Sequence, residues 1–408
     1  MRAGKLLLIA ALLAGCASTQ KPLPILATVP PGRVTWVGEL PVLHLSGSPY
    51  EMGYQHGSLL RRQVQASVAN AMAFIRGEAG VPVVGGWMAA RLLDRSWKRM
   101  APHVPLRIQE EMEGLADGAM VPLATLQRIH ALPELMATSC ASFAAFGRAT
   151  KEGRLIQIRN LDWAIQSDVQ RYAAIFVHHP AGKRSFVSMG WLGFVGVVSG
   201  INDQGISIGE IGAKTVDGGL DGIPMPFLLR RVLEEAQDLK QAVSIVEEGP
   251  RTGGYNYLFA DAIRKEAVAL ETTHRHCVVF RADQEGGRNP FAVNVPDAIF
   301  RSDWVLDPAV RDLQLASNGD PKRPGLEPPF GSSAYEIRYR GQGLLLDKFR
   351  GAVDAEVAMA IARAIAPSSN IQSVVYAYPE LWVANASGRR AAAVGRYLHL
   401  ALSDLFRE

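Results

Sequence analysis

The spacing of apolar residues divides the chain near residue 140. Before it, apolar side chains recur at intervals of three and four residues, as on one face of an α-helix. Each of these runs begins near a glycine or a proline, which favours several separate helices. We therefore predict that most of the chain before residue 140 is helical. The helical runs are residues 50–76, 86–100, 105–119 and 122–135.

After residue 140 the apolar residues form short runs bounded by turn residues, which predict β-strands. Residues 140–147 and 154–163 flank the polar segment 148–153 and are typical of a β-hairpin. Because strands and helices do not alternate regularly, the pattern favours a layered α+β domain with a mostly antiparallel sheet. Further strands are predicted at 172–179, 184–190, 194–200, 205–212, 255–261, 266–272, 276–282, 290–295, 372–379, 380–385 and 393–402, and helices at 224–236, 239–249 and 353–366.

The start of the chain is typical of an export signal. A basic start precedes an apolar run of ten residues, which is shorter than the roughly 20 residues that span a bilayer. Residues 13–16 read Leu-Ala-Gly-Cys and resemble the bacterial lipobox, which implies removal of the signal peptide 1–15 and lipid attachment to Cys16. Ala17 in place of an aspartate then favours the periplasmic side of the outer membrane. The alternative is an ordinary signal peptide with an incidental cysteine.

Composition excludes several classes of protein. The 408 residues include 43 Lys and Arg against 39 Asp and Glu, and no long basic run, so we expect no nucleic-acid partner. Hydrophobic residues make up 48% of the chain, which is enough for a folded core. Three cysteines are too few for a disulfide scaffold. We divide the chain into the signal peptide 1–15, a proline-rich tether 16–40, a helical propeptide or subunit 41–139, and a catalytic domain 140–408.

Cys140 is the cysteine whose surroundings favour reactivity. It opens the predicted hairpin, and the return strand brings Arg159 and Asp162 back alongside it. A cation next to a thiol favours the thiolate, which is the nucleophilic form. Side chains alternate along a strand, so Arg159 and Asp162 can both reach Cys140 only if the strand bulges. Cys277 lies within an apolar run and is best read as a buried strand residue.

The residues around Cys140 also carry a family resemblance. Ser-Cys-Ala-Ser-Phe at 139–143, followed by Arg-Asn-Leu-Asp-Trp at 159–163, resembles the N-terminal-nucleophile cysteine hydrolases. The similarity is greatest to the acyl-coenzyme A:6-aminopenicillanate acyltransferase-like family, which is related to the choloylglycine (bile-salt) hydrolases and the acid ceramidase-like amidases. It extends through 46–57, 201–212, 222–236, 292–297 and 332–340. The resemblance implies a four-layer αββα sandwich.

The resemblance implies that the bond between Ser139 and Cys140 is cleaved. Cys140 would then begin a new chain, and its free α-amine, with an ordinary pKa of about 7.7–8.0, could act as the base near neutral pH. Arg159 matches the arginine beside the thiolate, and Asp162 matches the aspartate that orients the amine.

Two later residues are matched to the same site by the resemblance. Asn294 matches the asparagine that stabilises the oxyanion, although it could equally be a turn residue before Pro296. Arg338 matches a late arginine, with Arg340 nearly as good a match. Glu210 stands where some relatives have a second asparagine.

These features predict an autoprocessing cysteine amidohydrolase that cleaves a linear amide of an acylated small molecule through a thioester, without a metal or an organic cofactor. Acyl transfer from a coenzyme A thioester or an amide to an amine is the alternative within the family. A non-catalytic lipoprotein that binds an acylated ligand is the alternative from another class. Residues 205–209 read Gly-Ile-Ser-Ile-Gly, but they lie within a predicted strand and not at the strand–turn–helix of a serine hydrolase.

Overall fold

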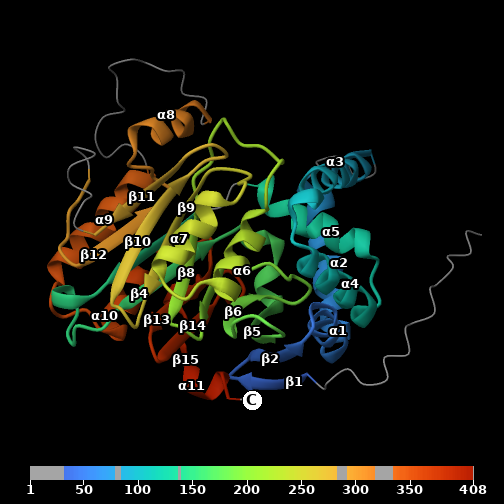
Figure 1. The fold of residues 1–408 in the computed structure, drawn as a ribbon, viewed down its shortest axis with the longest axis horizontal. Helices are drawn as coiled ribbons and strands as arrows, with labels where there is room; N and C mark the ends of the chain where they lie inside the picture. The colour runs from blue at the N-terminus through green and yellow to red at the C-terminus, as the bar shows by residue number, and fades with distance from the viewer. Residues whose placement is uncertain (1–31, 79–83, 137–138, 283–291, 318–333, 408) are drawn as a thin grey trace, which may run out of the picture.

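Two β-sheets packed face to face form the centre of the molecule, and helices cover both outer faces (Figure 1). The computed structural model describes residues 32–78, 84–136, 139–282, 292–317 and 334–407. The predicted signal peptide and Cys16 lie outside these residues. Within them, the larger sheet has nine strands in the order β1 (Arg33–Val37), β2 (Leu40–Gly47), β5 (Ala173–Pro180), β6 (Phe186–Trp191), β7 (Ser199–Asn202), β8 (Ile206–Gly212), β9 (Tyr255–Asp261), β10 (Glu266–Thr272) and β11 (Cys277–Arg281).

The smaller sheet lies against β8, β9 and β10 of the larger one. Its strands are, in order, β12 (Ala298–Ser302), β3 (Ser139–Ala145), β4 (Ile156–Asp162), β13 (Asn370–Ala377), β14 (Glu380–Asn385) and β15 (Leu398–Ala401). Helices α6 (Met225–Glu235) and α7 (Leu239–Glu248) pack on the larger sheet, and α9 (Ala334–Lys348) and α10 (Ala355–Ala364) pack on the smaller one. The predicted α+β class and αββα sandwich are confirmed.

The hairpin predicted at residue 140 is formed by β3 and β4. The two strands are antiparallel, and Cys140 faces Leu161 across them. Gly147 and Gly153 lie in the connection with φ of 54° and 67°, a backbone conformation that glycine adopts without steric cost. Every residue of β4 is buried, because one face of the strand meets the larger sheet and the other meets α10.

The N-terminal segment differs from its predicted boundaries. Residues 33–40, assigned above to the tether, and residues 41–47, assigned to the helical segment, contribute an antiparallel hairpin of β1 and β2. β2 then pairs in parallel with β5, so the segment before residue 139 supplies two strands to the larger sheet. The short strands escaped prediction because Gly38 and Pro41 interrupt the pattern and β1, at the sheet edge, is largely exposed.

The predicted N-terminal helices form a cluster beside β2, β5 and β6 (Figure 1). Helix α1 crosses α4 closely because glycines line the contact: a Cβ on Gly53 would lie 1.9 Å from the Glu111 carbonyl oxygen, and one on Gly114 would lie 2.0 Å from that of Tyr50. A Cβ on Gly57 would likewise lie 2.5 Å from the Ala119 nitrogen, so the contact explains Gly53 and Gly57 of the 46–57 motif. The helices are α1 (Pro49–Leu59), α2 (Arg61–Glu78), α3 (Val84–Met100), α4 (Leu106–Ala119) and α5 (Leu123–Ala131).

Several elements after residue 290 were not predicted. Residues 292–295 precede a strand instead of forming one, and β12 begins at Ala298. Helices α8 (Pro308–Ser317), α9 and α11 (Leu402–Leu405) also escaped prediction. α9 places arginines and glycines between its apolar residues, so its sequence lacks a clear apolar stripe.

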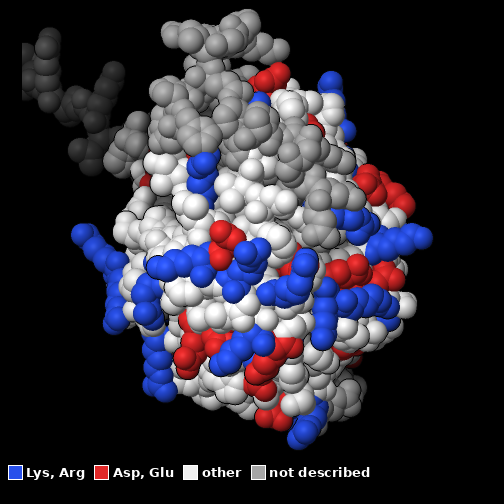
Figure 2. All heavy atoms as spheres, turned by 90° about the vertical axis from the view of Figure 1, so that its left-hand side faces the viewer, with Lys and Arg blue, Asp and Glu red and all other residues white. Residues whose placement is uncertain are grey.

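The surface carries charges of both signs. On the face shown in Figure 2, basic side chains are interspersed with acidic ones. None of the helices in the described residues is long and apolar enough to cross a membrane.

Candidate active site

Cys140 lies between the two sheets, on the inner face of β3. Its side chain is fully buried. Residues directly opposite each other in an antiparallel pair share a face, so Leu161 lies on the same side as Cys140, and Arg159, opposite Ser142, does too. The sequence therefore places the thiol and the guanidinium on one face, as the hairpin prediction required.

Arg159 joins Cys140 to Glu210 of the facing sheet. Its Nη2 atom lies 3.4 Å from Cys140 Sγ and 2.8 Å from Glu210 Oε2. The guanidinium is fully buried, and its Nε and Nη1 atoms have no hydrogen-bond partner among the described residues. Gly209 makes room for this arrangement, because a Cβ there would lie 3.1 Å from Arg159 Cγ. The last glycine of the Gly-x-Ser-x-Gly sequence, Gly209, thus leaves the space that the Arg159 side chain occupies.

Opposing effects act on the protonation of the Cys140 thiol. Burial raises its pKa well above the ordinary value, the Arg159 charge lowers it, and the Glu210 carboxylate raises it again. The Sγ atom is 3.9 Å from Glu210 Oε2, within range of a weak S–H donor bond. In this structure Cys140 is therefore a neutral thiol, with a carboxylate close enough to receive its proton.

Asp162 faces a different set of partners. Its Oδ2 atom accepts a bond of 2.5 Å from Arg338 Nη1 on α9, and its Oδ1 accepts one of 3.1 Å from Asn370 on β13. Burial raises the pKa of the Asp162 carboxyl, and Arg338 offsets part of that rise. The pairing between β4 and β13 shifts register at residues 370–372, opposite the end of β4. The predicted irregularity is thus present, but in the partner strand.

Asp303 holds the main chain at the predicted cleavage site. Its Oδ1 accepts the Cys140 N–H at 2.9 Å, and its Oδ2 accepts the Ser139 hydroxyl at 2.7 Å. Burial raises the pKa of Asp303 to about 7, although Arg338, 4.0 Å away, acts in the opposite direction. Asp303, which was not predicted, therefore occupies the position beside the Cys140 nitrogen that had been assigned to Asp162.

The structure does not bring Asn294 to Cys140. β12 runs antiparallel to β3, with Ala298 opposite Ala145 and Ser302 opposite Ala141. The end of β12 that leads into Asp303 is thus the end beside Cys140. Asn294 precedes the other end and is exposed, with the length of the strand, about 3.3 Å per residue, between it and the thiol. The predicted oxyanion role of Asn294 has no support in this register.

Of the other predicted residues, Arg338 lies at the site and Arg340 and Ser207 do not. Arg338 reaches Asp162, whereas Arg340 lies 3.8 Å from Glu336, one turn away on α9, so Arg338 is the better match. Ser207 lies within β8 and donates to Gln157 of β4, so it is no nucleophile at a strand–helix turn. In the part of the chain that the structure describes, no group of three His, Cys, Asp or Glu side chains could hold a metal ion.

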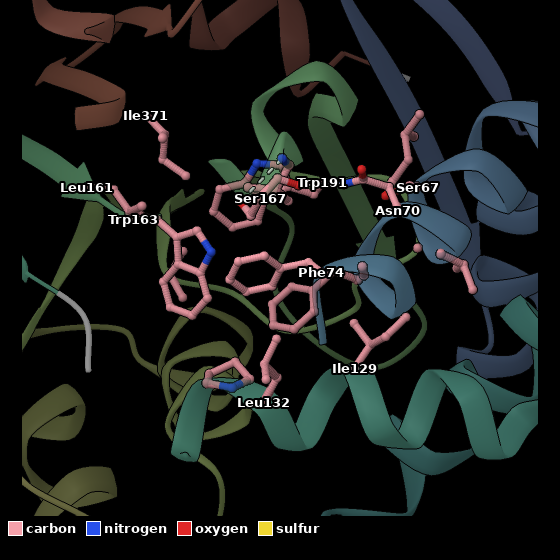
Figure 3. A pocket seen from close by; sticks show the side chains of 18 of the residues that line it. Ser67, Asn70, Phe74, Ile129, Leu132, Leu161, Trp163, Ser167, Trp191 and Ile371 are labelled. Atoms are coloured by element: carbon pink, nitrogen blue, oxygen red, sulfur yellow. Dashed lines mark hydrogen bonds between the residues drawn. The ribbon is translucent and has the colours of Figure 1, made fainter. Parts of the chain in front are cut away.

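An apolar pocket adjoins the Cys140 group (Figure 3). Leu161 and Glu210, which flank Cys140, form one wall, and Trp163 and Trp191 continue it. The opposite wall comes from α2, α5 and the residue that follows α5, where Phe74, Ile129 and Leu132 point into the cavity (Figure 3). The cavity measures about 120 Å³. The residues that line the cavity come from before and after the predicted cleavage site in the sequence, so the N-terminal helices form part of the pocket.

Glu210 and Asp303, the two carboxylates next to Cys140, differ in how far the sequence indicates their role. Glu210 is the one charged residue of the strand predicted at 205–212. Such a residue is expensive to bury without a partner, which marks it as functional or ion-paired. Asp303 follows directly after a buried strand, but that strand was itself not predicted.

The fold gives the class of structure to which the chain belongs. Cys140 lies near the start of β3, an inner strand of an αββα sandwich, and this sandwich is the fold of the N-terminal-nucleophile hydrolases. Residues 148–289 match the model of the family described as acyl-coenzyme A:6-aminopenicillanic acid acyl-transferase, which confirms the resemblance predicted from the sequence.

Similar proteins come from distant organisms. Protein dcd1B of Dictyostelium discoideum is 29% identical over 52% of this chain and 46% of its own length, so the match spans about half of that relative. Acid ceramidase of Bos taurus is 22% identical over 65% of this chain and 75% of its own. Among solved structures, the Caenorhabditis elegans ortholog of N-acylethanolamine-hydrolyzing acid amidase is 15% identical with a TM-score of 0.42, over 58% of this chain and 92% of its own.

Proposed function

We propose that the protein is a cysteine amidohydrolase that cleaves the linear amide of an acylated small molecule, after cleavage of its own Ser139–Cys140 bond. The observation that carries this proposal is the buried group of Cys140, Arg159 and Glu210 at the start of β3, with Nη2 of Arg159 3.4 Å from the thiol. Such a thiol needs only a base and an acyl donor to act as a nucleophile.

The mechanism follows from this geometry. Once the Ser139–Cys140 bond is cleaved, the Cys140 nitrogen becomes a free α-amine on the same residue as the thiol and can take up its proton. The thiolate, stabilised by Arg159, attacks the amide carbonyl of the substrate and expels the amine as a thioester forms. Water then releases the acid. Every acid–base step is served by side chains or the chain's own amine, so the proposal needs no metal or cofactor.

The pocket supports an apolar acyl group as the part of the substrate that is held. Its aromatic and aliphatic lining begins at Leu161 and Glu210, directly beside Cys140. An acyl chain in this cavity would place its carbonyl at the thiol, and each methylene removed from water contributes about 0.8 kcal/mol. Acid ceramidase, one of the relatives named above, takes its name from ceramide, an N-acylated lipid, which agrees with this substrate class.

Acyl transfer is the second candidate, and the family model favours it by its description. It shares every step up to the thioester and differs only in whether water or an amine attacks next. Adding a small primary amine to the reaction separates the two, because a transferase yields the new amide in place of free acid.

We also propose that Cys16 carries a lipid which anchors the protein to the periplasmic face of the outer membrane. The support is the Leu-Ala-Gly-Cys sequence at 13–16 behind a short apolar run. An anchor of this kind would keep the pocket near membrane-derived acyl amides.

Intact mass and N-terminal sequencing of the purified protein test the proposed function. We expect two chains, one ending at Ser139 and the other beginning at Cys140, and hydrolysis of N-acyl amides by the mixture. Cys140→Ala should remain a single, inactive chain, whereas the matched variant Cys277→Ala should be processed like the wild type. A purified wild-type chain that keeps its Ser139–Cys140 bond would favour the non-catalytic lipoprotein that binds an acylated ligand.

A further inference from the structure

One carboxyl group, that of Asp303, accepts hydrogen bonds from the residues on both sides of the Ser139–Cys140 peptide bond. Asp303 Oδ2 accepts the hydroxyl of Ser139 at 2.7 Å, and Oδ1 accepts the N–H of Cys140 at 2.9 Å. These two residues contribute the acyl half and the amine half of the bond that the proposed maturation breaks. Asp303 itself is only 4% exposed, so bulk water does not compete for these contacts.

The backbone that carries Asp303 is held in place by side chains from β9 and α8. Asn256 of β9 donates to the carbonyl oxygens of Ser302 at 2.9 Å and Trp304 at 3.2 Å, the residues on either side of Asp303. Gln314 of α8 donates to the carbonyl of Asp303 itself at 2.5 Å. A carboxyl group fixed in this way is pre-organised toward the Cys140 nitrogen and does not have to be recruited during the reaction.

We infer that Asp303 is a catalytic residue of the maturation step, in which its carboxylic acid gives a proton to the departing Cys140 nitrogen. The inference rests on the proposed function, since it concerns the cleavage that creates the active form. Cleavage of an amide requires a proton on the nitrogen that leaves, and Asp303 is the acidic side chain hydrogen-bonded to that nitrogen.

The bonds and protons of the step balance. Cys140 Sγ gives its proton to Glu210, 3.9 Å away, and forms a bond to the carbonyl carbon of Ser139. In the tetrahedral intermediate the Cys140 nitrogen gains a lone pair, which can accept the proton carried by the neighbouring Oδ1 of Asp303. The bond from the carbonyl carbon to that nitrogen then breaks, and the nitrogen leaves with its second hydrogen. Water then hydrolyses the Ser139 thioester, giving the Ser139 carboxyl group and restoring the thiol. The proton on Glu210 passes to the new amine, which remains as an ammonium group beside the Asp303 carboxylate.

The charge state of Asp303 suits this role. Burial raises its pKa to about 7, so a substantial fraction of the group is protonated near neutral pH, unlike an ordinary aspartate. The neighbouring charges are Arg338, which favours the carboxylate, and Asp162, which favours the acid. Asp162 is bonded to Arg338 and Asn370 and so is occupied elsewhere.

The test is the rate at which newly made full-length chain is converted to the two-chain form, followed on denaturing gels between pH 5 and pH 9. Asp303→Asn keeps the shape of the side chain but cannot transfer a proton, so we expect processing to slow by at least about 100-fold. Asp303→Glu retains an acid and should process faster than Asp303→Asn. Asp261→Asn, which alters another buried aspartate at the end of β9, should match the wild type.

The outcomes separate this inference from the proposed function. Slow processing of Asp303→Asn, together with loss of an inflection near pH 7 that the wild type shows, supports the acid role. Processing of Asp303→Asn at the wild-type rate, or equal rates for Asp303→Asn and Asp303→Glu, overturns it while leaving autoprocessing intact. A wild-type chain that is never cleaved overturns the proposed maturation itself, and this inference with it. Thermal unfolding of each variant shows whether a slow rate comes from a folded protein.

Discussion

Arg159 Nη2 lies 3.4 Å from Cys140 Sγ in a region closed to solvent, and the same nitrogen also binds Glu210. The arginine is the charge that lowers the pKa of the thiol against the effect of burial. We therefore predict that Arg159→Met raises that pKa further and slows alkylation of Cys140 at neutral pH by about 10-fold or more. Peptide mass spectrometry of iodoacetamide-treated protein measures the rate at Cys140 alone.

The control for this variant concerns stability. Arg159→Met leaves Glu210 buried without its partner, and breaking a buried pair in this way costs about 3–5 kcal/mol. Glu210→Gln in the same chain removes the orphaned charge, so the double variant should unfold at a higher temperature than Arg159→Met. An alkylation profile that is unchanged in a folded Arg159 variant would leave the arginine with a structural role only.

The pairing of Cys140 with Arg159 was predictable because it is local. Nineteen positions separate the two residues, and the polar turn between two apolar runs is enough to fold them into a hairpin. The facing contacts were not predictable in the same way. Glu210 reaches the thiol only because β8 packs across β3. Asp303, which is 163 residues from Cys140 in the sequence, reaches the Cys140 nitrogen only because β12 pairs with β3. Such contacts depend on the relative placement of strands, which periodicity does not encode.

The error at Asn294 has the same origin. A sequence match assigned it an oxyanion role, but the role depends on which end of the next strand lies beside Cys140. That end is fixed by the antiparallel pairing of β12 with β3, which places Asp303 there. Likewise, residues 33–47 show no clear strand pattern, and the second partner of β2 is β5, which follows more than a hundred residues later.

A buried ion pair joins the two halves of a chain cleaved after Ser139. Glu111 comes before residue 139 in the sequence and Arg230 after it, both side chains are 1% exposed, and they are 2.5 Å apart. We expect the two chains to co-elute under native conditions. Glu111→Ala should lower stability by about 1–3 kcal/mol and weaken that association, because Arg230 loses one of its two buried carboxylate partners and keeps Glu234.

Asp94→Ala is the matched control, since it removes a partly exposed partner of Arg128 within the N-terminal segment and should cost about 1 kcal/mol or less. Size-exclusion chromatography and thermal unfolding of the cleaved protein measure both effects. If the Glu111→Ala chains elute together and unfold as the Asp94→Ala chains do, the buried pair does not hold the two halves.

The pocket predicts a preference for substrates with long acyl groups. Ala71 lines the cavity from α2, and a phenylalanine there would fill space that an acyl chain would occupy. We expect Ala71→Phe to lower kcat/KM for long acyl amides by about 10- to 100-fold, from the loss of two or three buried methylenes at about 0.8 kcal/mol each. Short acyl amides should be affected much less.

Ala66→Phe provides the control, because Ala66 lies on the exposed face of the same helix. Rates measured over a series of acyl chain lengths test the prediction. A uniform loss at every chain length in Ala71→Phe would mean that the cavity is not the acyl site.

The lipid anchor predicts where the protein is found in the cell. Cys16→Ser should block lipid attachment, so the protein should shift from the membrane fraction to the soluble fraction or accumulate with its signal peptide uncleaved. Cell fractionation followed by mass measurement of the N-terminal peptide distinguishes these results. Membrane association of Cys16→Ser equal to that of the wild type would exclude the lipobox interpretation.

The last prediction concerns the pH dependence of stability, and it does not depend on catalysis. Burial raises the pKa of Asp303 from 3.8 to about 7, so the folded protein binds a proton there more tightly than the unfolded chain does. The contribution of protonated Asp303 to the stability of the fold is therefore fully present below pH 3.8. It is lost as the pH rises through the folded-state pKa of about 7. Asp303→Asn removes this titration. In the Cys140→Ala chain, which stays uncleaved, the unfolding temperature should therefore fall relative to that of the Cys140→Ala, Asp303→Asn double variant between pH 4 and pH 7. A constant difference over that range would mean that Asp303 is ionised throughout, and the proton that we assign to it would then have to come from another group.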